Sequence, residues 1–387
     1  MTGQGVAVSA AFDGGNIEVE SCAGPQDIRL NIRADNAADF RQWFYFRLTG
    51  ARGHDCTLRL LNAGACSYPG GWENYQACAS VDGRTWVRVP TSYADGVLTI
   101  THRPPADAIY FAYFAPYSLD RHAALVAGAV AHPHVALEVP GQTLDGRDID
   151  ILRFGDGEPT AKQLWFIARQ HPGETMAEWW MEGLIARLSD ADDPVTAGLL
   201  AEAVCHVVPN MNPDGSARGN LRTNAGGANL NREWRDATVE TAPEVFHVRA
   251  KMAETGVDFC LDVHGDEALP VNFIAGYEGI PDLATDHLAL LDDYRAELAA
   301  QSPDFQTARG YPKAAAGKAD LRICTSYLAD RFRCLSMTLE MPFKDHDPRP
   351  DAAQGWSPAR ARRLAGDVLD VTYRLRGRLG RFERSGK

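Results

Sequence analysis

A histidine and a carboxylate stand close together where an apolar run meets a helix-like segment. His171 and Glu174 belong to HPGE, which follows LWFIAR (164–169) and precedes TMAEWWMEGLIARL. Side chains three residues apart at such a junction can face one point. Imidazole and carboxylate both suit zinc, and a catalytic zinc usually has three protein ligands and a water. Taken alone, an HxxE pair is better explained by a capping carboxylate beside a surface histidine.

A third ligand is available at the end of another apolar run. His264 ends DFCLDVH, and with Glu267 it forms a second HxxE. Because the carboxyl ends of parallel strands share one edge of a sheet, His264 is expected to join the first pair through folding. His171 and Glu174 are preferred as the local pair, since Asp266 and Glu267 fall in a predicted loop with no helix to orient them.

Two arginines lie in the Gly- and Asn-rich segment MNPDGSARGNLRTNAGGANLNREW (211–234). This segment is predicted to be a long loop without a helix, and long loops in compact domains are usually functional or disordered. It holds Arg222 and the pair Asn231-Arg232. Guanidinium groups bind carboxylates and stabilise oxyanions, although a surface position explains either arginine alone.

Glu340 lies in or just after the apolar run CLSMTLEMP (334–342). A buried carboxylate is costly unless it has a cation or a task. A paired structural glutamate and a catalytic group are equally good explanations on composition alone.

Four apolar runs predict the buried strands that position these residues: 164–169, 203–209, 258–264 and 334–342. Helices are expected at 175–188 and around 241–255, 283–300 and 357–377. Alternation of such strands and helices predicts an α/β domain over residues 118–387, with its chemistry just beyond the carboxyl ends of the strands.

Residues 1–117 predict a β-sandwich, because short alternating runs are separated by Gly, Asp and Asn turns. Asp82-Gly83 and Asp95-Gly96 are expected at hairpin turns. Core packing is the preferred role of the aromatic residues here, ahead of a carbohydrate platform; these are Trp43, Phe44, Tyr45, Trp72 and Trp86.

Composition excludes several classes of protein. The 387 residues have a net charge of −12, which argues against binding to nucleic acid or to an anionic membrane. The longest small-apolar run, 123–131, is too short for a membrane helix, and the start lacks the features of a signal peptide. Eight cysteines without metal-site spacing predict reduced thiols and a cytoplasmic location. Motifs of the main competing chemistries (GxSxG, HExxH, P-loop, GxGxxG) were not found.

The ordered set HPGE, NPDG, GNLR, NLNREW, DVHG and TLEMPF resembles the M14 metallocarboxypeptidases. The β-domain and the wording ARQHPGETMAEWWMEG resemble their cytosolic carboxypeptidase branch. This resemblance implies an α/β/α sandwich around a mixed sheet, preceded by a small β-sandwich.

The resemblance also implies roles for individual residues. His171, Glu174 and His264 would bind one zinc ion per chain, and Glu340 would act as general base and acid. Arg222 would hold the oxyanion. The substrate's terminal carboxylate would be bound by Asn231 and Arg232.

Two departures from the family pattern affect the site. Many members have an aspartate two residues before the Asn-Arg pair, where it orients the first zinc histidine; here Asn229 stands there and adds no charge. The family's substrate-capping tyrosine has two candidates, Tyr311 and Tyr327, between which the sequence does not choose.

The expected function is a zinc-dependent, cytosolic exopeptidase that acts on the C-terminal tails of peptides or proteins. A zinc-dependent deacylase of N-acyl amino acids on the same fold is the alternative, and a non-catalytic binding module is a third. The basic segment 310–333 predicts a preference for acidic C-terminal residues, with Lys318 and Arg322 as the pocket cations. The oligomeric state is left open.

Overall fold

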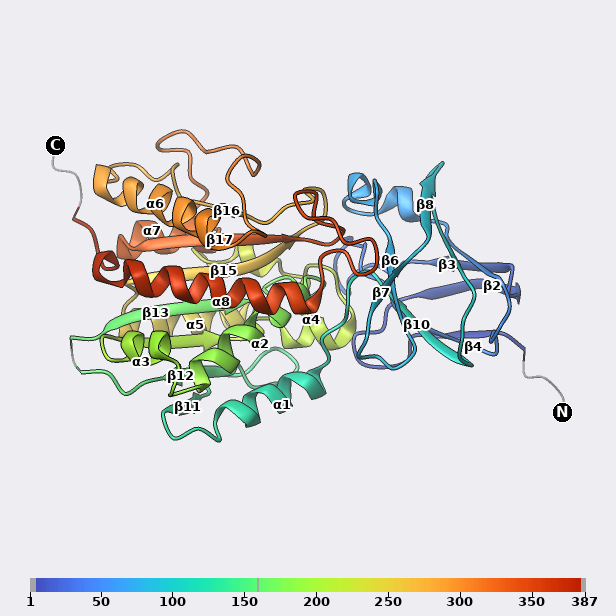
Figure 1. Ribbon diagram of the computed structural model, residues 1–387, viewed down its shortest axis with the longest axis horizontal. Coiled ribbons are helices and arrows are strands. Elements are labelled where there is room, and N and C mark those ends of the chain that lie inside the picture. Colours follow the sequence, from blue (N-terminus) through green and yellow to red (C-terminus); the bar gives the residue numbers. More distant parts are fainter. Residues whose placement is uncertain (1–4, 159, 384–387) are drawn as a thin grey trace.

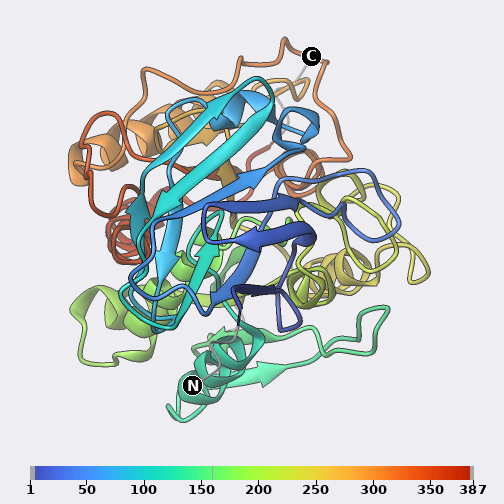
Figure 2. The same cartoon turned by 90° about the vertical axis from the view of Figure 1, so that its right-hand side faces the viewer.

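The structure is a computed structural model that describes residues 5–158 and 160–383. Its N-terminal part is a sandwich of two five-stranded sheets (Figure 1, Figure 2). The first sheet has the order β1 (Ala7–Ser9), β4 (Tyr45–Thr49), β10 (Ala108–Ala112), β6 (Ala77–Ser80) and β7 (Val87–Val89). The second has the order β2 (Glu18–Gly24), β3 (Asp27–Asn31), β5 (Cys56–Leu60), β9 (Val97–His102) and β8 (Thr91–Ala94).

The predicted hairpin and aromatic core are present in this sandwich. Asp95 and Gly96 connect the antiparallel strands β8 and β9, with φ of 51° and 79°, as a type I′ turn requires. Trp43, Phe44 and Trp72 are at most 3% exposed. The aromatic residues therefore fill the core, and an exposed carbohydrate platform is not formed by them.

The C-terminal part is built on a seven-stranded mixed sheet with the order β11-β12-β14-β13-β15-β17-β16. Its strands are β11 (Val135–Glu138), β12 (Ile151–Phe154), β13 (Lys162–Ala168), β14 (Ala203–Val208), β15 (Phe259–Asp266), β16 (Phe273–Ala275) and β17 (Leu335–Pro342). Strands β14, β13, β15 and β17 are parallel and coincide with the four predicted apolar runs.

Helices cover both faces of this sheet, so the expected α/β/α sandwich is confirmed (Figure 1). One face packs against α2 (Met176–Ser189), α6 (Thr285–Gln301) and α8 (Pro358–Leu375), and the other against α5 (Pro243–Thr255) and α7 (Cys324–Phe332). The shorter elements are α1 (Leu119–Ala129), α3 (Pro194–Leu200), α4 (Pro213–Arg218), and the 3-10 turns η1 (Ala63–Ala65), η2 (Pro69–Trp72), η3 (Leu230–Arg232) and η4 (Arg376–Arg378).

The expectation that segment 211–234 contains no helix is wrong, because α4 and η3 lie within it. The side chain of Asn212 caps α4, Pro213 stands at its first position, and Gly219 ends it with φ of 70°. These are strong local signals for a short helix. The long predicted loop is therefore two turns of helix joined by a shorter loop.

The N-terminal sandwich lies against the end of the C-terminal sheet at which β15 and β17 finish (Figure 1). Asn16 donates to the carbonyl of Gly219 at 2.8 Å, and Arg88 donates to that of Phe343 at 2.8 Å. The predicted boundary at residues 117 and 118 falls in the connection between β10 and α1 and stays a prediction.

All eight cysteines are free thiols. Within the described ranges, no helix is long and apolar enough to cross a bilayer.

Candidate active site

Strand alternation and register place His264 beside Glu340. The two residues are direct partners in the parallel pair β15 and β17. Neighbours of opposite parity, such as Val263 and Leu339, point into the core beneath α2 and α8. Because successive side chains alternate across a strand, His264 and Glu340 both face the other way, at the carboxyl ends of their strands.

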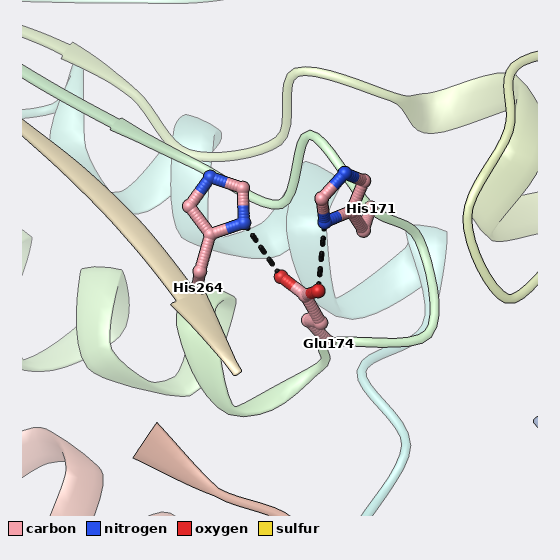
Figure 3. Close-up of side chains that lie close together, drawn as sticks. All are labelled: His171, Glu174 and His264. Carbon is pink, nitrogen blue, oxygen red and sulfur yellow. Dashed lines mark hydrogen bonds and ion pairs between the residues drawn. The ribbon is translucent and has the colours of Figure 1, made fainter. Parts of the chain in front are cut away.

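His171 and Glu174 approach the same point from the turn between β13 and α2 (Figure 3). Nδ1 of His171 lies 2.7 Å from one oxygen of Glu174, and Nδ1 of His264 lies 2.8 Å from the other. One donor atom from each residue lies within 4.8 Å of those of the other two, and all three side chains are buried. Two imidazole nitrogens and one carboxylate that converge in this way fit a catalytic zinc with an open position.

A second layer of hydrogen bonds orients the two imidazoles. Nε2 of His171 lies 3.0 Å from Oδ1 of Asn229, and Nε2 of His264 lies 2.9 Å from a carboxylate oxygen of Asp262. Partners of this kind fix the tautomer that leaves Nδ1 free for a metal. Asn229 was predicted from the sequence and Asp262 was not, although Asp262 stands two residues before His264 and so on the same face of β15.

Charges around the cluster shift the pKa values of its members. Burial, aided by Arg222, lowers the pKa of His171 to about 4, which keeps that imidazole neutral. Burial also opposes charge on His264, but the carboxylates of Asp262 and Glu174 outweigh it and raise its pKa well above 6.5. The pKa of Glu174 is lowered, since the two histidines outweigh its burial.

Glu340 is 6% exposed, and its Oε2 has no hydrogen-bond partner among the described residues. Burial, together with the neighbouring carboxylates of Glu174, Asp266 and Glu267, raises its pKa well above 4.5, against the opposing effect of His264. A carboxyl group with a raised pKa and a free oxygen can both accept and return a proton.

Arg222 and Arg232 face the same pocket without a counter-ion in the described chain. The guanidinium of Arg222 lies 5.7 Å from the ring centroids of both Phe40 and Tyr68. Burial and the charge of Arg222 lower the pKa of Arg232. Two neighbouring guanidinium groups that repel each other in this way favour the binding of an anion between them. Asn231 lies beside them, with its Oδ1 accepting the backbone N–H of Cys324 at 2.9 Å.

A pocket of about 570 Å³ joins the metal cluster, both arginines and Glu340. Lys318 lines it, but Arg322 does not: its guanidinium is half exposed and pairs with Asp320 at 2.8 Å. The prediction that Arg322 lines the pocket is therefore wrong, because its guanidinium forms this local ion pair instead. Further along the pocket lie Arg295 and Lys313, which the sequence analysis did not single out as pocket residues.

The structure distinguishes the two tyrosine candidates. Tyr311 lines the pocket, and its hydroxyl donates to Asp266 at 2.6 Å and lies 3.4 Å from Oε1 of Glu340. Tyr327 packs against Trp234, beneath the guanidinium of Arg249. Only Tyr311 can reach a group bound beside Glu340.

Comparison with known proteins supports the same assignment for both parts of the chain. Residues 8–114 match the family described as cytosolic carboxypeptidase N-terminal domain, and residues 122–348 match the family described as zinc carboxypeptidase.

Similar proteins extend this match over almost the whole chain. An uncharacterised protein of Zymomonas mobilis is 52% identical, over 94% of this chain and 95% of its own. A solved metallo-carboxypeptidase of Pseudomonas aeruginosa, in complex with (2-guanidinoethylmercapto)succinic acid, is 44% identical with a TM-score of 0.93, over 96% of this chain and 99% of that one.

Cytosolic carboxypeptidase 4 of the mouse is 27% identical over 68% of this chain, and the match spans only 28% of the mouse protein. Both family matches, the folded architecture and the clustered site agree with one another. The chain is an M14 zinc carboxypeptidase that carries the N-terminal domain of the cytosolic carboxypeptidases.

Proposed function

We propose that this enzyme hydrolyses the C-terminal peptide bond of peptides or protein tails and releases single residues. The observation that carries the proposal is the pair Arg222 and Arg232, which have no counter-ion among the described residues and line one pocket with the cluster of His171, Glu174 and His264. A carboxypeptidase must bind two anionic groups: the free C-terminal carboxylate, and the oxyanion that forms at the scissile carbonyl.

Zinc held by the His171, Glu174 and His264 cluster would act as a Lewis acid that polarises the carbonyl and lowers the pKa of a water molecule. Glu340 accepts the proton of the attacking water and returns it to the leaving amine. Its free Oε2 and raised pKa suit this exchange.

Arg222 and Arg232 each bind a different anionic group of the substrate. Arg222 stabilises the oxyanion, because it lines the same pocket as the metal cluster and its charge acts on His171. Arg232 binds the terminal carboxylate with the Nδ2 group of Asn231, and thereby aligns the last peptide bond. Tyr311, in the connection between α6 and α7, closes over the bound residue, and its ring contacts that of Phe273 edge-on.

We further propose a preference for acidic C-terminal residues. Lys318 lines the pocket and has no ion pair among the described residues, whereas Arg295 is already paired with Glu278 at 2.7 Å. Lys318 is therefore the cation most available to a substrate side-chain carboxylate. Its exposure limits the gain to about fivefold in rate, the scale of a solvated ion pair.

The experiment is a zinc-loaded digestion of a peptide library with varied C-terminal residues, read by mass spectrometry. Loss of single residues from the C-terminus is the expected result, with Glu and Asp released faster than Leu or Lys. N-acyl amino acids form a parallel arm: if they are hydrolysed and the peptides are not, the enzyme is a deacylase.

Lys318→Ala and Arg322→Ala are the matched variants for the acidic preference. Lys318→Ala should narrow the gap between Glu- and Leu-ended peptides, and Arg322→Ala, outside the pocket, should leave it unchanged. Equal wild-type rates on both peptides at low salt would disprove the preference and leave the carboxypeptidase proposal intact. The eight free thiols fit a reducing compartment, which supports the cytoplasm as the site of action.

A further inference from the structure

A carboxylate of the N-terminal sandwich is bonded to the backbone that carries Arg222. One oxygen of Asp35 accepts the N–H of Leu221 at 2.5 Å, and the other accepts the N–H groups of Arg222 and Thr223 at 2.8 and 2.9 Å. The hydroxyl of Thr223 donates a fourth bond at 3.0 Å. Three consecutive backbone N–H groups thus converge on one carboxylate, which is the arrangement of an anion-binding nest.

Asp35, which anchors residues 221–223, is itself held in place by a hydrogen bond within the sandwich. The N–H of Asp35 donates to the carbonyl of Phe40 at 2.7 Å, so the turn between them is closed. Asp35 is 4% exposed, and burial of a carboxylate is costly unless hydrogen bonds compensate it. All of its four compensating donors come from residues 221–223, so any displacement of that segment leaves the charge poorly satisfied.

The side chain of Arg222 is also placed by the sandwich. Its guanidinium lies over the rings of Phe40 and Tyr68 at 5.7 Å each, and Tyr68 lines the active-site pocket. Cation–π contacts position a guanidinium without neutralising it. The N-terminal part therefore holds Arg222 at two points. Asp35 accepts a hydrogen bond from its backbone N–H, and two aromatic rings contact its guanidinium.

We propose that Asp35 is a positioning residue for the reaction, and that the N-terminal sandwich completes the active site through Arg222. This inference rests on the proposed function, in which Arg222 stabilises the oxyanion. A carboxylate that only joined the two parts of the chain would stabilise the fold equally well with or without Arg222. A positioning carboxylate acts on turnover only through that arginine.

The test is a double-mutant cycle with Asp35→Asn and Arg222→Ala, measured as kcat and KM on a peptide that the wild type cleaves. In the wild-type background Asp35→Asn should lower kcat by about 10- to 100-fold, because sub-ångström to 1 Å displacements of a catalytic group have this effect. In the Arg222→Ala background the same change should cost less than about twofold. Bound zinc should stay at the wild-type level in all variants.

Arg88→Gln is the matched control. Arg88 also belongs to the sandwich and donates to catalytic-part carbonyls, those of Phe343, Gln354 and Trp356, at 2.8 to 3.3 Å. None of these contacts touches the Arg222 segment. If Arg88→Gln lowers kcat, it should therefore do so by the same factor whether residue 222 is arginine or alanine.

Hydrogen exchange of the amides of residues 221–223 gives a readout that needs no turnover. They should be protected in the wild type and exchange at least tenfold faster in Asp35→Asn. Equal kcat losses from Asp35→Asn in both backgrounds, an unchanged kcat, or unprotected wild-type amides would each overturn the inference. If the wild type cleaves no peptide, the proposed function fails, and the exchange data still test the anchor by themselves.

Discussion

The two ring nitrogens of His264 each lie beside a carboxylate, and the two carboxylates have different roles. Its Nδ1 lies 2.8 Å from Glu174, in the space that a metal would share, and its Nε2 lies 2.9 Å from Asp262. The imidazole is thereby fixed in orientation before any ligand arrives, which is the usual role of a carboxylate behind a metal-binding histidine.

His264→Ala should remove most of the bound zinc and leave the chain folded. Two ligands hold zinc far less tightly than three, while the core between β15 and helices α2 and α8 is built by residues of the opposite parity, such as Leu261 and Val263. Metal analysis and circular dichroism check this. Full zinc occupancy in the variant would show that another residue is the third ligand.

Glu340→Gln should bind zinc and substrate normally and lose about a thousandfold or more in turnover, since an amide cannot take the proton from water. Single-turnover kinetics with a peptide that binds the wild type provide the measurement. Near-normal turnover would reduce Glu340 to a structural carboxylate.

The metal cluster and Glu340 could be predicted as candidates from the sequence because these residues lie at or just after apolar strand runs, within recognisable motifs. Asp35 could not be predicted in this way: it lies 187 residues before Arg222, and only folding brings it to that backbone. The prediction that Arg322 lines the pocket was wrong, because its guanidinium is paired with Asp320, two residues away in the sequence.

At the scale of elements, the turn after β13 is held by a buried charge network. Arg169, at φ of 59°, precedes the HPGE segment and pairs with Glu178 of α2. Glu178 also meets His122 of α1 at 2.7 Å, and the other nitrogen of His122 lies 3.1 Å from Asp150. The network ties α1, α2 and the start of the metal-binding turn together.

This network predicts a pH-dependent contribution to stability. Burial lowers the pKa of His122, but its bonds to Asp150 and Glu178 outweigh burial and raise it from 6.5 to about 9. A raised folded-state pKa means that the stabilisation is complete below pH 6.5 and is lost as the pH rises through 9. It amounts to at most about 3.5 kcal/mol, at about 1.4 kcal/mol per pKa unit.

The measurement compares the free energy of unfolding of the wild type and His122→Gln between pH 6 and 9.5. The gap between them should shrink as pH rises. His206→Gln is the control: burial lowers the pKa of His206 to about 3, so this histidine is neutral throughout the range. A gap for His122→Gln that stays constant with pH would show that folding does not shift the pKa of His122.

Strands and long helices followed from the sequence more readily than short helices did. Continuous apolar runs mark buried parallel strands, and β13, β14, β15 and β17 all appeared within about two residues of their predicted bounds. Helix α7 was missed because its nine residues, CTSYLADRF, sit inside a basic, turn-rich segment. Its helical state depends on packing of Cys324 and Leu328 against the sheet.

At the scale of the whole molecule, the β-sandwich lies over the edge of the sheet where the site is built (Figure 1). Composition predicted that two parts exist, but not how they meet, because contacts such as Arg88 to Phe343 join residues 255 apart in sequence. The pocket that holds the metal cluster is lined in part by Tyr68 of the sandwich.

In the proposed function, the pocket binds the free C-terminal carboxylate of the substrate. Its most direct measurement is the rate of residue release from one peptide prepared as the free acid and as the C-terminal amide, with zinc-loaded wild type and Arg232→Ala. The wild type should cleave the free acid at least about a hundredfold faster, since the amide lacks the charge that pairs with the half-buried guanidinium of Arg232. Arg232→Ala should lose most of that discrimination. Equal cleavage of the acid and the amide by the wild type would contradict the account.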